Sequence, residues 1–170
     1  MKQKSILFVC TGNVFRSMSA EYCFKKHLSN QGIKNWKVNS AGIVAKRGAP
    51  IDPKTIKTLE SIGIKEINHN QKRLTKHMLN SYNIIIAMSK NHLNFIKSKL
   101  GYKNALLFNE LASNKKSSIM DIEDEIKDYK TNRKAVEKKI EETVKEIYKK
   151  TPALFKNVSK LPDFALENIH

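Results

Sequence analysis

Short apolar runs alternate along this chain with segments whose apolar residues recur at helical spacing. The strand-like runs are KSILFVC (4–10), WKVNSAG (36–42), YNIIIAM (82–88) and NALLF (104–108). Helical patterns cover residues 17–30, 53–62, 90–100 and 129–150, with an Asp-Pro start at Asp52 and glycine stops at Gly63 and Gly101. Because strands that alternate with helices form βαβ units, we predict an α/β fold: a single-domain, open, parallel four-stranded sheet with helices on both faces.

The length of the chain suits one domain. Its 170 residues can bury a core, and no glycine- or proline-rich linker divides them. We expect residues 1–150 to form the domain and residues 151–170 to be a C-terminal extension of unknown role. No apolar run approaches the roughly 20 residues that cross a bilayer, and the N-terminus lacks the features of a signal peptide. With only two cysteines, these features predict a cytoplasmic protein with free thiols and no membrane association.

The net charge of +16 is less informative than its size suggests. The lysines are spread over the whole chain, and few alternate with aromatic residues as a stacking surface for bases requires. No nucleic-acid-binding module is recognisable. We therefore expect no specific nucleic-acid partner.

The first strand ends at a position suited to chemistry. Ligands of parallel sheets bind beyond the carboxyl ends of the strands, and Cys10 lies at that end of the first strand. The segment from Thr11 to Arg16 can curl so that its backbone N–H groups converge with the start of the helix at Ser17, which forms a site for a tetrahedral oxyanion. The segment is not a Walker A loop, because no Gly-Lys-Ser/Thr follows.

Two side chains of this segment point to phosphoryl chemistry. A helix N-terminus and a nearby guanidinium both stabilise the thiolate of Cys10, and the planar fork of Arg16 can grip two oxygens of a phosphate. The pair suggests nucleophilic attack on phosphorus. The simpler alternative is that a lone cysteine at a strand end is a small buried hydrophobe, which is what we expect of Cys23.

The sequence VCTGNVFRSMSAE resembles the phosphate-binding loop of the low-molecular-weight protein tyrosine phosphatases, whose signature is Cys-x5-Arg-Ser. The similarity continues through NSAG, DPKTIKTLESIGI, a histidine followed by RLT, IIIAM and FNELA. It implies that Cys10 is the nucleophile and Arg16 the phosphate clamp, with Asn13, Ser17, Ser40 and His69 supporting the loop. The residues expected to surround the phosphate are Thr11, Gly12, Asn13, Val14, Phe15 and Ser17. The resemblance implies neither a cofactor nor a metal, and none of the five histidines has metal-ligand spacing.

The family also uses an aspartate, in an Asp-Pro pair before the last helix, to protonate the leaving group. Alignment of SIMDIEDEIKDY from both sides sets Asp124 at that position, with Asp121 as the second candidate. The prolines that flank the family's acid are replaced by Glu123 and Glu125. The alternative is that this segment is an acidic turn that places negative charge near a helix N-terminus.

The expected substrate is a phosphotyrosine-containing protein, with inorganic phosphate or vanadate as inhibitors. Relatives that act on phosphoarginine resemble one another in having a threonine where this chain has Val14, whereas the tyrosine phosphatases have an aliphatic residue there. The family's aromatic pocket wall falls near Ala45 and Lys46, so no aromatic residue fills it. Phe15 replaces the second cysteine that often precedes the clamp arginine, which excludes redox protection by a vicinal disulfide.

Two other functions remain as alternatives. An arsenate reductase would need further cysteines in the region of residues 80–90, and the sequence has none there. A non-catalytic or weakly active anion-binding regulatory module could keep the loop and lose the acid. The sequence leaves the oligomeric state open.

Overall fold

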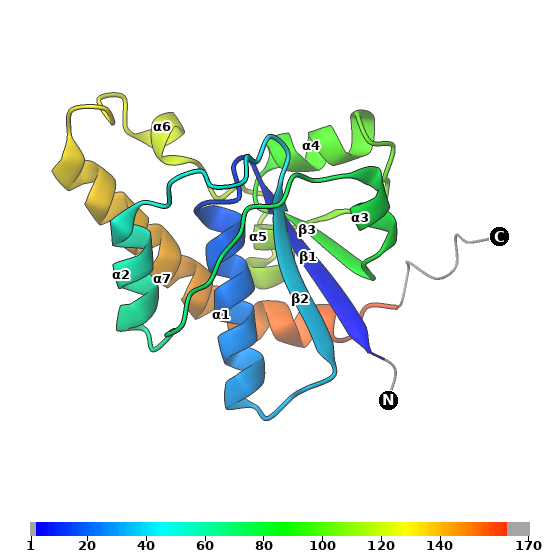
Figure 1. Ribbon diagram of the computed structural model, residues 1–170. Coiled ribbons are helices and arrows are strands. Elements are labelled where there is room, and N and C mark those ends of the chain that lie inside the picture. Colours follow the sequence, from blue (N-terminus) through cyan, green and yellow to red (C-terminus); the bar gives the residue numbers. More distant parts are fainter. Residues whose placement is uncertain (1–2, 163–170) are drawn as a thin grey trace.

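The structure, a computed structural model, describes residues 3–162. Four parallel strands form one sheet in the order β2-β1-β3-β4 (Figure 1). The strands are β1 (Lys4–Cys10), β2 (Trp36–Gly42), β3 (Ile84–Ala87) and β4 (Leu106–Leu107). This arrangement confirms the predicted open parallel sheet, with the phosphate-binding loop directly after the first strand.

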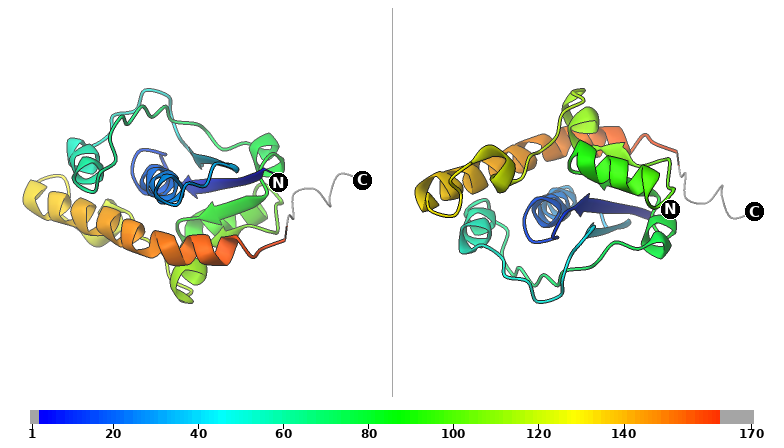
Figure 2. Two further views of the ribbon diagram at one scale, coloured as in Figure 1. Left: turned by 90° about the horizontal axis from the view of Figure 1, so that it is seen from below. Right: turned by 90° about the horizontal axis from the view of Figure 1, so that it is seen from above.

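Helices cover both faces of the sheet (Figure 2). They are α1 (Arg16–Asn30), α2 (Pro53–Ser61), α3 (Lys76–Asn80), α4 (Lys90–Ser98), α5 (Phe108–Ser113), α6 (Ile122–Glu125) and α7 (Arg133–Val158). Helices α1, α2, α5 and α7 contribute to one hydrophobic core, while α3 and α4 contribute to the core on the opposite face. The short helices α3, α5 and α6 were not predicted from the sequence.

Strand β1 supplies both cores because its side chains alternate between the two faces of the sheet. Phe8 points to the larger core, where its ring lies 5.7 Å from that of Phe24 on α1 and 6.4 Å from that of Phe108 on α5. Leu7 and Val9 point to the smaller core. The strand is central and buried, which fixes the position of Cys10 at its end.

Helix α7 is longer than predicted. The expected end at Lys150 is wrong, because the helix continues through Pro152 to Val158. Leu154 and Val158 are 1% and 0% exposed in the larger core, so the helix crosses the boundary that we expected between residues 150 and 151. Residues 163–170 of the expected extension lie outside the described residues. Within residues 3–162, no helix has both the length and the apolar character that a membrane span needs.

Candidate functional site

Residues 11–15 form a loop that leads from β1 into α1 at the carboxyl edge of the sheet (Figure 1). The carbonyl oxygens of Cys10 and Thr11 accept hydrogen bonds from the backbone N–H groups of Ile43 and Val44, at 2.9 and 3.0 Å. Gly42 lies so close below the loop that a Cβ on it would be 2.5 Å from the carbonyl oxygen of Thr11. The end of β2 therefore holds the loop from one side.

The nucleophile candidate Cys10 lies at the base of this loop. Its side chain is almost completely buried, and its Sγ is 2.9 Å from the Oγ of Ser17. Phe15 occupies the N-cap position of α1 and makes no side-chain hydrogen bond to the first turn. The backbone N–H groups of that turn thus point toward the loop without a cap, which is the arrangement that binds an oxyanion.

Asn13 organises the loop from beneath. Its φ of +57° is left-handed, a conformation that asparagine tolerates better than most residues. Its Nδ2 donates to the Oγ atoms of Ser17 and Ser40 at 2.9 and 2.8 Å, and its Oδ1 accepts from the backbone N–H of Lys72 at 3.0 Å. The Nε2–H of His69 donates to the carbonyl oxygen of Asn13 at 2.7 Å. The structure thus brings together all four residues that the sequence assigned to the support of the loop.

A buried carboxylate extends this network, and sequence reasoning missed it. Glu21 on α1 is 3% exposed, and its carboxylate accepts a hydrogen bond from the Oγ of Ser40 and pairs with Lys25. Burial lowers the pKa of His69, while its bond to Asn13 and the charge of Glu21 oppose that effect. The available signal was the position of Glu21 in RSMSAE, on the buried side of the helix.

Arg16 connects the loop to the segment that contains Ile119 and Asp121. Its side chain is 4% exposed; Nη1 donates to the carbonyl oxygen of Ile119 at 3.0 Å, and Nη2 donates to Oδ2 of Asp121 at 2.7 Å and to Oγ1 of Thr11 at 3.3 Å. A guanidinium has five N–H donors, and these three contacts leave the Nε–H and one Nη1–H without a protein acceptor.

The structure places Asp121, rather than Asp124, against the loop. Ile119 is anchored by a backbone hydrogen bond from its N–H to the carbonyl oxygen of Met88, at 2.9 Å, which brings the next residues over the end of β3. Asp121 is then the N-cap of α6, with its Oδ1 accepting from the N–H of Ile122 at 2.8 Å. Asp124 lies further along α6 and lines the same cavity, but it makes no hydrogen bond to Arg16 or Cys10.

A cavity of about 510 Å³ opens beside the loop. The residues that line it are Thr11, Arg16, Ile43, Ser89, Lys90, Asn91, His92, Ser118, Met120, Asp121, Glu123 and Asp124. No Phe, Tyr or Trp is among them. Ala45 is buried, Lys46 is exposed, and neither of them lines this cavity. Val44 and Met120 are the two exposed large hydrophobic side chains of residues 3–162. The backbone of Val44 contacts the loop at Thr11, and Met120 lines the cavity.

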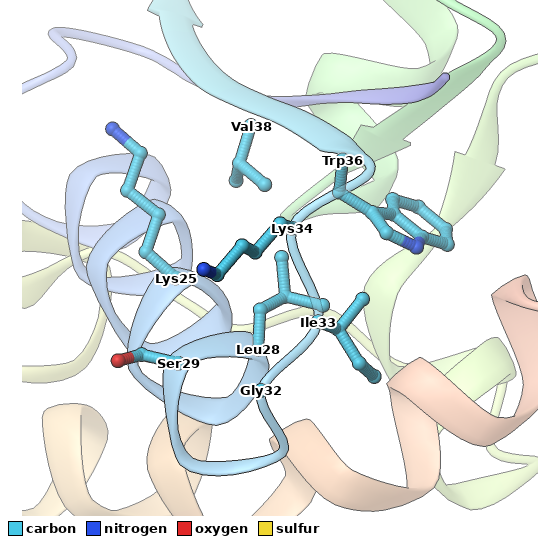
Figure 3. Close-up of a pocket in the computed structure, with 8 residues that line it drawn as sticks. All are labelled: Lys25, Leu28, Ser29, Gly32, Ile33, Lys34, Trp36 and Val38. Atoms are coloured by element: carbon cyan, nitrogen blue, oxygen red, sulfur yellow. The ribbon is translucent and has the colours of Figure 1, made fainter. Parts of the chain in front are cut away.

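A second cavity, of about 300 Å³, lies between the end of α1 and the start of β2 (Figure 3). Leu28, Ile33, Trp36 and Val38 form its apolar wall, with the side chains of Lys25 and Lys34 at its rim. Its lining contains neither a cysteine nor a carboxyl or imidazole group that could activate Ser29, so it does not compete with the loop as a reaction site. Among residues 3–162, no three His, Cys, Asp or Glu side chains are grouped in a way that could hold a metal ion.

Comparison with known proteins identifies a family that the chain matches. Residues 5–161 match the family model described as low molecular weight phosphotyrosine protein phosphatase. The chain resembles the solved structure of a YwlE mutant from Bacillus subtilis, with a TM-score of 0.78 and 25% identity over 93% of this chain and 100% of the other.

Three curated relatives match shorter stretches. A protein-arginine-phosphatase from Bacillus subtilis (strain 168) is 35% identical over 96 residues, which are 56% of this chain and 63% of the relative. Arsenate reductase 2 from Staphylococcus haemolyticus is 35% identical over 88 residues, 52% of this chain and 62% of the relative. The low molecular weight phosphotyrosine protein phosphatase of Gallus gallus is 33% identical over 98 residues, 56% and 61% of the two chains. The matched stretches thus span a little under two thirds of these relatives.

Proposed function

This chain belongs to the low molecular weight phosphotyrosine protein phosphatase family, and we propose that it hydrolyses phosphotyrosine monoesters, without a metal, through a phosphocysteine intermediate on Cys10. The observation that carries the proposal is the position of the Cys10 sulfur. It lies at the uncapped N-terminus of α1, within hydrogen-bond distance of Ser17, and the loop connects it to the buried side chain of Arg16.

In the first step, the thiolate of Cys10 attacks phosphorus and the P–O bond to the tyrosine oxygen breaks. The Oγ of Ser17 already accepts from Asn13, so its hydroxyl proton is available to stabilise the thiolate. The loop N–H groups and Arg16 hold the equatorial oxygens as charge builds on them. We assign the proton donor for the leaving oxygen to Asp121, in place of Asp124, because its carboxyl group borders both Arg16 and the cavity.

In the second step, a water molecule attacks the phosphocysteine from the side that the leaving group has vacated. Asp121, now a carboxylate, accepts a proton from that water, the S–P bond breaks, and inorganic phosphate and the Cys10 thiolate are regenerated. The same binding site explains why phosphate and vanadate are the expected inhibitors. Phosphorylated proteins are the expected partners, and the reduced state of the nucleophile fits a cytosolic location.

Phosphoarginine is the second candidate substrate, and two observations favour it. One relative is a protein-arginine-phosphatase. In addition, three carboxyl groups line the cavity, from Asp121, Glu123 and Asp124, and could accept hydrogen bonds from a guanidinium. We favour phosphotyrosine because Val14 lacks the hydroxyl of threonine and because Ile43 and Met120 offer apolar surface to a ring.

Arsenate reduction has weaker support. A disulfide relay needs further accessible thiols, and the only other cysteine of the chain is Cys23. Cys23 is fully buried on α1, and burial raises the pKa of its thiol to about 12, so it cannot act as a thiolate at neutral pH.

Turnover of p-nitrophenyl phosphate tests the proposal. We expect the wild type to be active in the presence of a chelator and to be inhibited by vanadate. Cys10→Ser should lose activity by about a thousandfold or more, because no neighbouring base activates the hydroxyl, and Arg16→Lys should also fail, because an ammonium cannot make the two-pronged contact. Cys23→Ala is the matched control and should keep its turnover.

Peptides that carry phosphotyrosine or phosphoarginine then separate the two candidate substrates by their kcat/KM values. If the wild type were inactive but still bound vanadate, the phosphatase proposal would be wrong and the chain would be an anion-binding module. A clear preference for phosphoarginine would replace the tyrosine assignment by the arginine one.

A further inference from the structure

A buried histidine at the start of α4 contacts the phosphate-binding loop. His92, on the first turn of α4, is 2% exposed and lines the main cavity. Its Nε2 lies 2.9 Å from the Oγ1 of Thr11, and its Nδ1 lies 2.9 Å from the Oγ of Ser89. Neither the family resemblance nor the proposed mechanism assigns this side chain a role.

The protons of this cluster have one arrangement that satisfies every group. Arg16 can only donate, so the Oγ1 of Thr11 accepts from its Nη2. The hydroxyl proton of Thr11 is then free to be donated to the Nε2 of His92, and in this arrangement Nε2 is an unprotonated acceptor. The ring proton is consequently on Nδ1 and is donated to Ser89.

The other tautomer is disfavoured by charge. It would aim a ring N–H and the charged guanidinium at the same Thr11 oxygen and leave the hydroxyl proton of Thr11 without either of these partners. Burial and the charge of Arg16 keep the imidazole neutral, lowering the pKa of His92 to about 3. Ser89 is also the N-cap of α4, so it is already an acceptor on the side that faces His92.

The position of Thr11 gives the cluster a consequence for the reaction. The Nη2 of Arg16 is shared between Thr11 and Asp121, so the oxygen of Thr11 helps to set where the guanidinium lies relative to the candidate acid. A threonine hydroxyl is otherwise free to rotate, and His92 removes that freedom by accepting its proton.

We propose that His92 is a positioning residue for phosphoryl transfer: through the hydroxyl of Thr11, it orients the guanidinium of Arg16 between the bound phosphate and Asp121. This inference rests on the proposed phosphatase function. It defines a chain of contacts that runs from Ser89 through His92 and Thr11 to Arg16.

Steady-state kinetics with p-nitrophenyl phosphate test this chain. In His92→Leu the acceptor is lost and kcat/KM should fall about tenfold, as expected for a small misplacement of a clamp. In His92→Gln the side-chain oxygen can still accept from Thr11, so activity should stay within about threefold of the wild type. His77→Leu, at an exposed position on α3, is the matched control and should be unchanged.

A double-mutant cycle separates positioning from general stability. Thr11→Val should lower kcat/KM about as much as His92→Leu does. The double variant should be no less active than the less active single variant, because both substitutions break the same link. Losses that multiply, or a glutamine variant as poor as the leucine variant, would overturn the proposal.

A spectroscopic measurement keeps the proposal falsifiable if a variant does not fold or if the wild type does not turn over. The ¹⁵N chemical shifts of the wild-type imidazole should identify His92 as the neutral Nδ1–H tautomer at neutral pH, and a protonated Nε2 would overturn the proposal. If the wild type has this tautomer but no phosphatase activity, the proposed function fails first; the contact chain is then judged by phosphate affinity, which should fall in His92→Leu and not in His92→Gln.

Discussion

Replacement of Asp121 by asparagine is the most direct test of the site, because it removes one proton donor and leaves the surrounding structure in place. Asparagine is as good an N-cap as aspartate, so the hydrogen bond to the N–H of Ile122 and the start of α6 should persist. The ion pair with Arg16 is lost, which should cost about 1–3 kcal/mol of folding free energy, because the Arg16 side chain is 4% exposed and keeps only its bonds to Ile119 and Thr11. The fold should therefore survive the change.

The expected effect on catalysis is larger and depends on the leaving group. Loss of a general acid lowers rates by about 10²–10⁴-fold, which corresponds to about 3–5 kcal/mol of barrier. The full loss should apply to phenyl and tyrosyl phosphates, whose oxygens need the proton. p-Nitrophenyl phosphate should lose much less, because its leaving group is stable as an anion.

The assay is kcat/KM over a series of aryl phosphates, because this quantity reports the steps up to release of the alcohol and is insensitive to slow hydrolysis of the phosphocysteine. A plot of its logarithm against the pKa of the leaving group should be steeper for Asp121→Asn than for the wild type. Asp124→Asn is the matched control on the same short helix and should leave the slope unchanged. A larger loss in Asp124→Asn, or an Asp121→Asn loss that is equal for all leaving groups, would refute the assignment.

Three further predictions concern stability and specificity. Leu154→Ala removes a side chain that is 1% exposed, so the free energy of unfolding measured with urea should fall by about 2–5 kcal/mol, which would show that residues after 150 belong to the core. Folding lowers the pKa of His92 from 6.5 to about 3, so between these pH values the unfolded state binds one more proton than the folded state. The free energy of unfolding should therefore fall as the pH drops from 6.5 to about 3. In His92→Gln, this part of the plot of unfolding free energy against pH should be flatter. Val14→Thr should shift the ratio of kcat/KM values from phosphotyrosine toward phosphoarginine with little change in the melting temperature, and a ratio that ignored the substitution would exclude Val14 as a determinant of specificity.

The sheet and the loop could be predicted because their signals are local. The segment that forms β1 is mostly apolar, and the short loop after it contains Gly12 and is bounded by Cys10 and Arg16 at the spacing of the family signature. The end of α7 could not be predicted in the same way. Pro152 disfavours a helix by propensity, but Leu154 and Val158 bury their side chains against the core, and this tertiary packing outweighs the local preference.

The sequence pointed to Asp124 for the acid, whereas the structure brings Asp121 to Arg16, because nothing local in the sequence fixes the register of this segment. The stretch between α5 and α7 has no periodic apolar pattern, and the Asp-Pro pair of the family is absent. The structure sets the register through a backbone hydrogen bond from Ile119 to Met88, a contact that no side-chain pattern encodes. Glu21 and His92 were missed for a related reason: a polar residue in a buried position looks the same in sequence as one on the surface.

These contacts divide the site into two parts that are held separately. The nucleophile and the anion-binding loop depend on Asn13, Ser40 and Glu21, a buried network that is complete without any residue after position 72. The candidate acid depends on the segment around Ile119, and it meets the loop only through the guanidinium of Arg16. Because the two parts share that one side chain, a substitution in the acid segment should alter protonation of the leaving group while phosphate still binds, whereas a substitution beneath Asn13 should impair both. The link from His92 through Thr11 acts at this junction, which is why its loss should affect the rate of phosphoryl transfer more than the stability of either part.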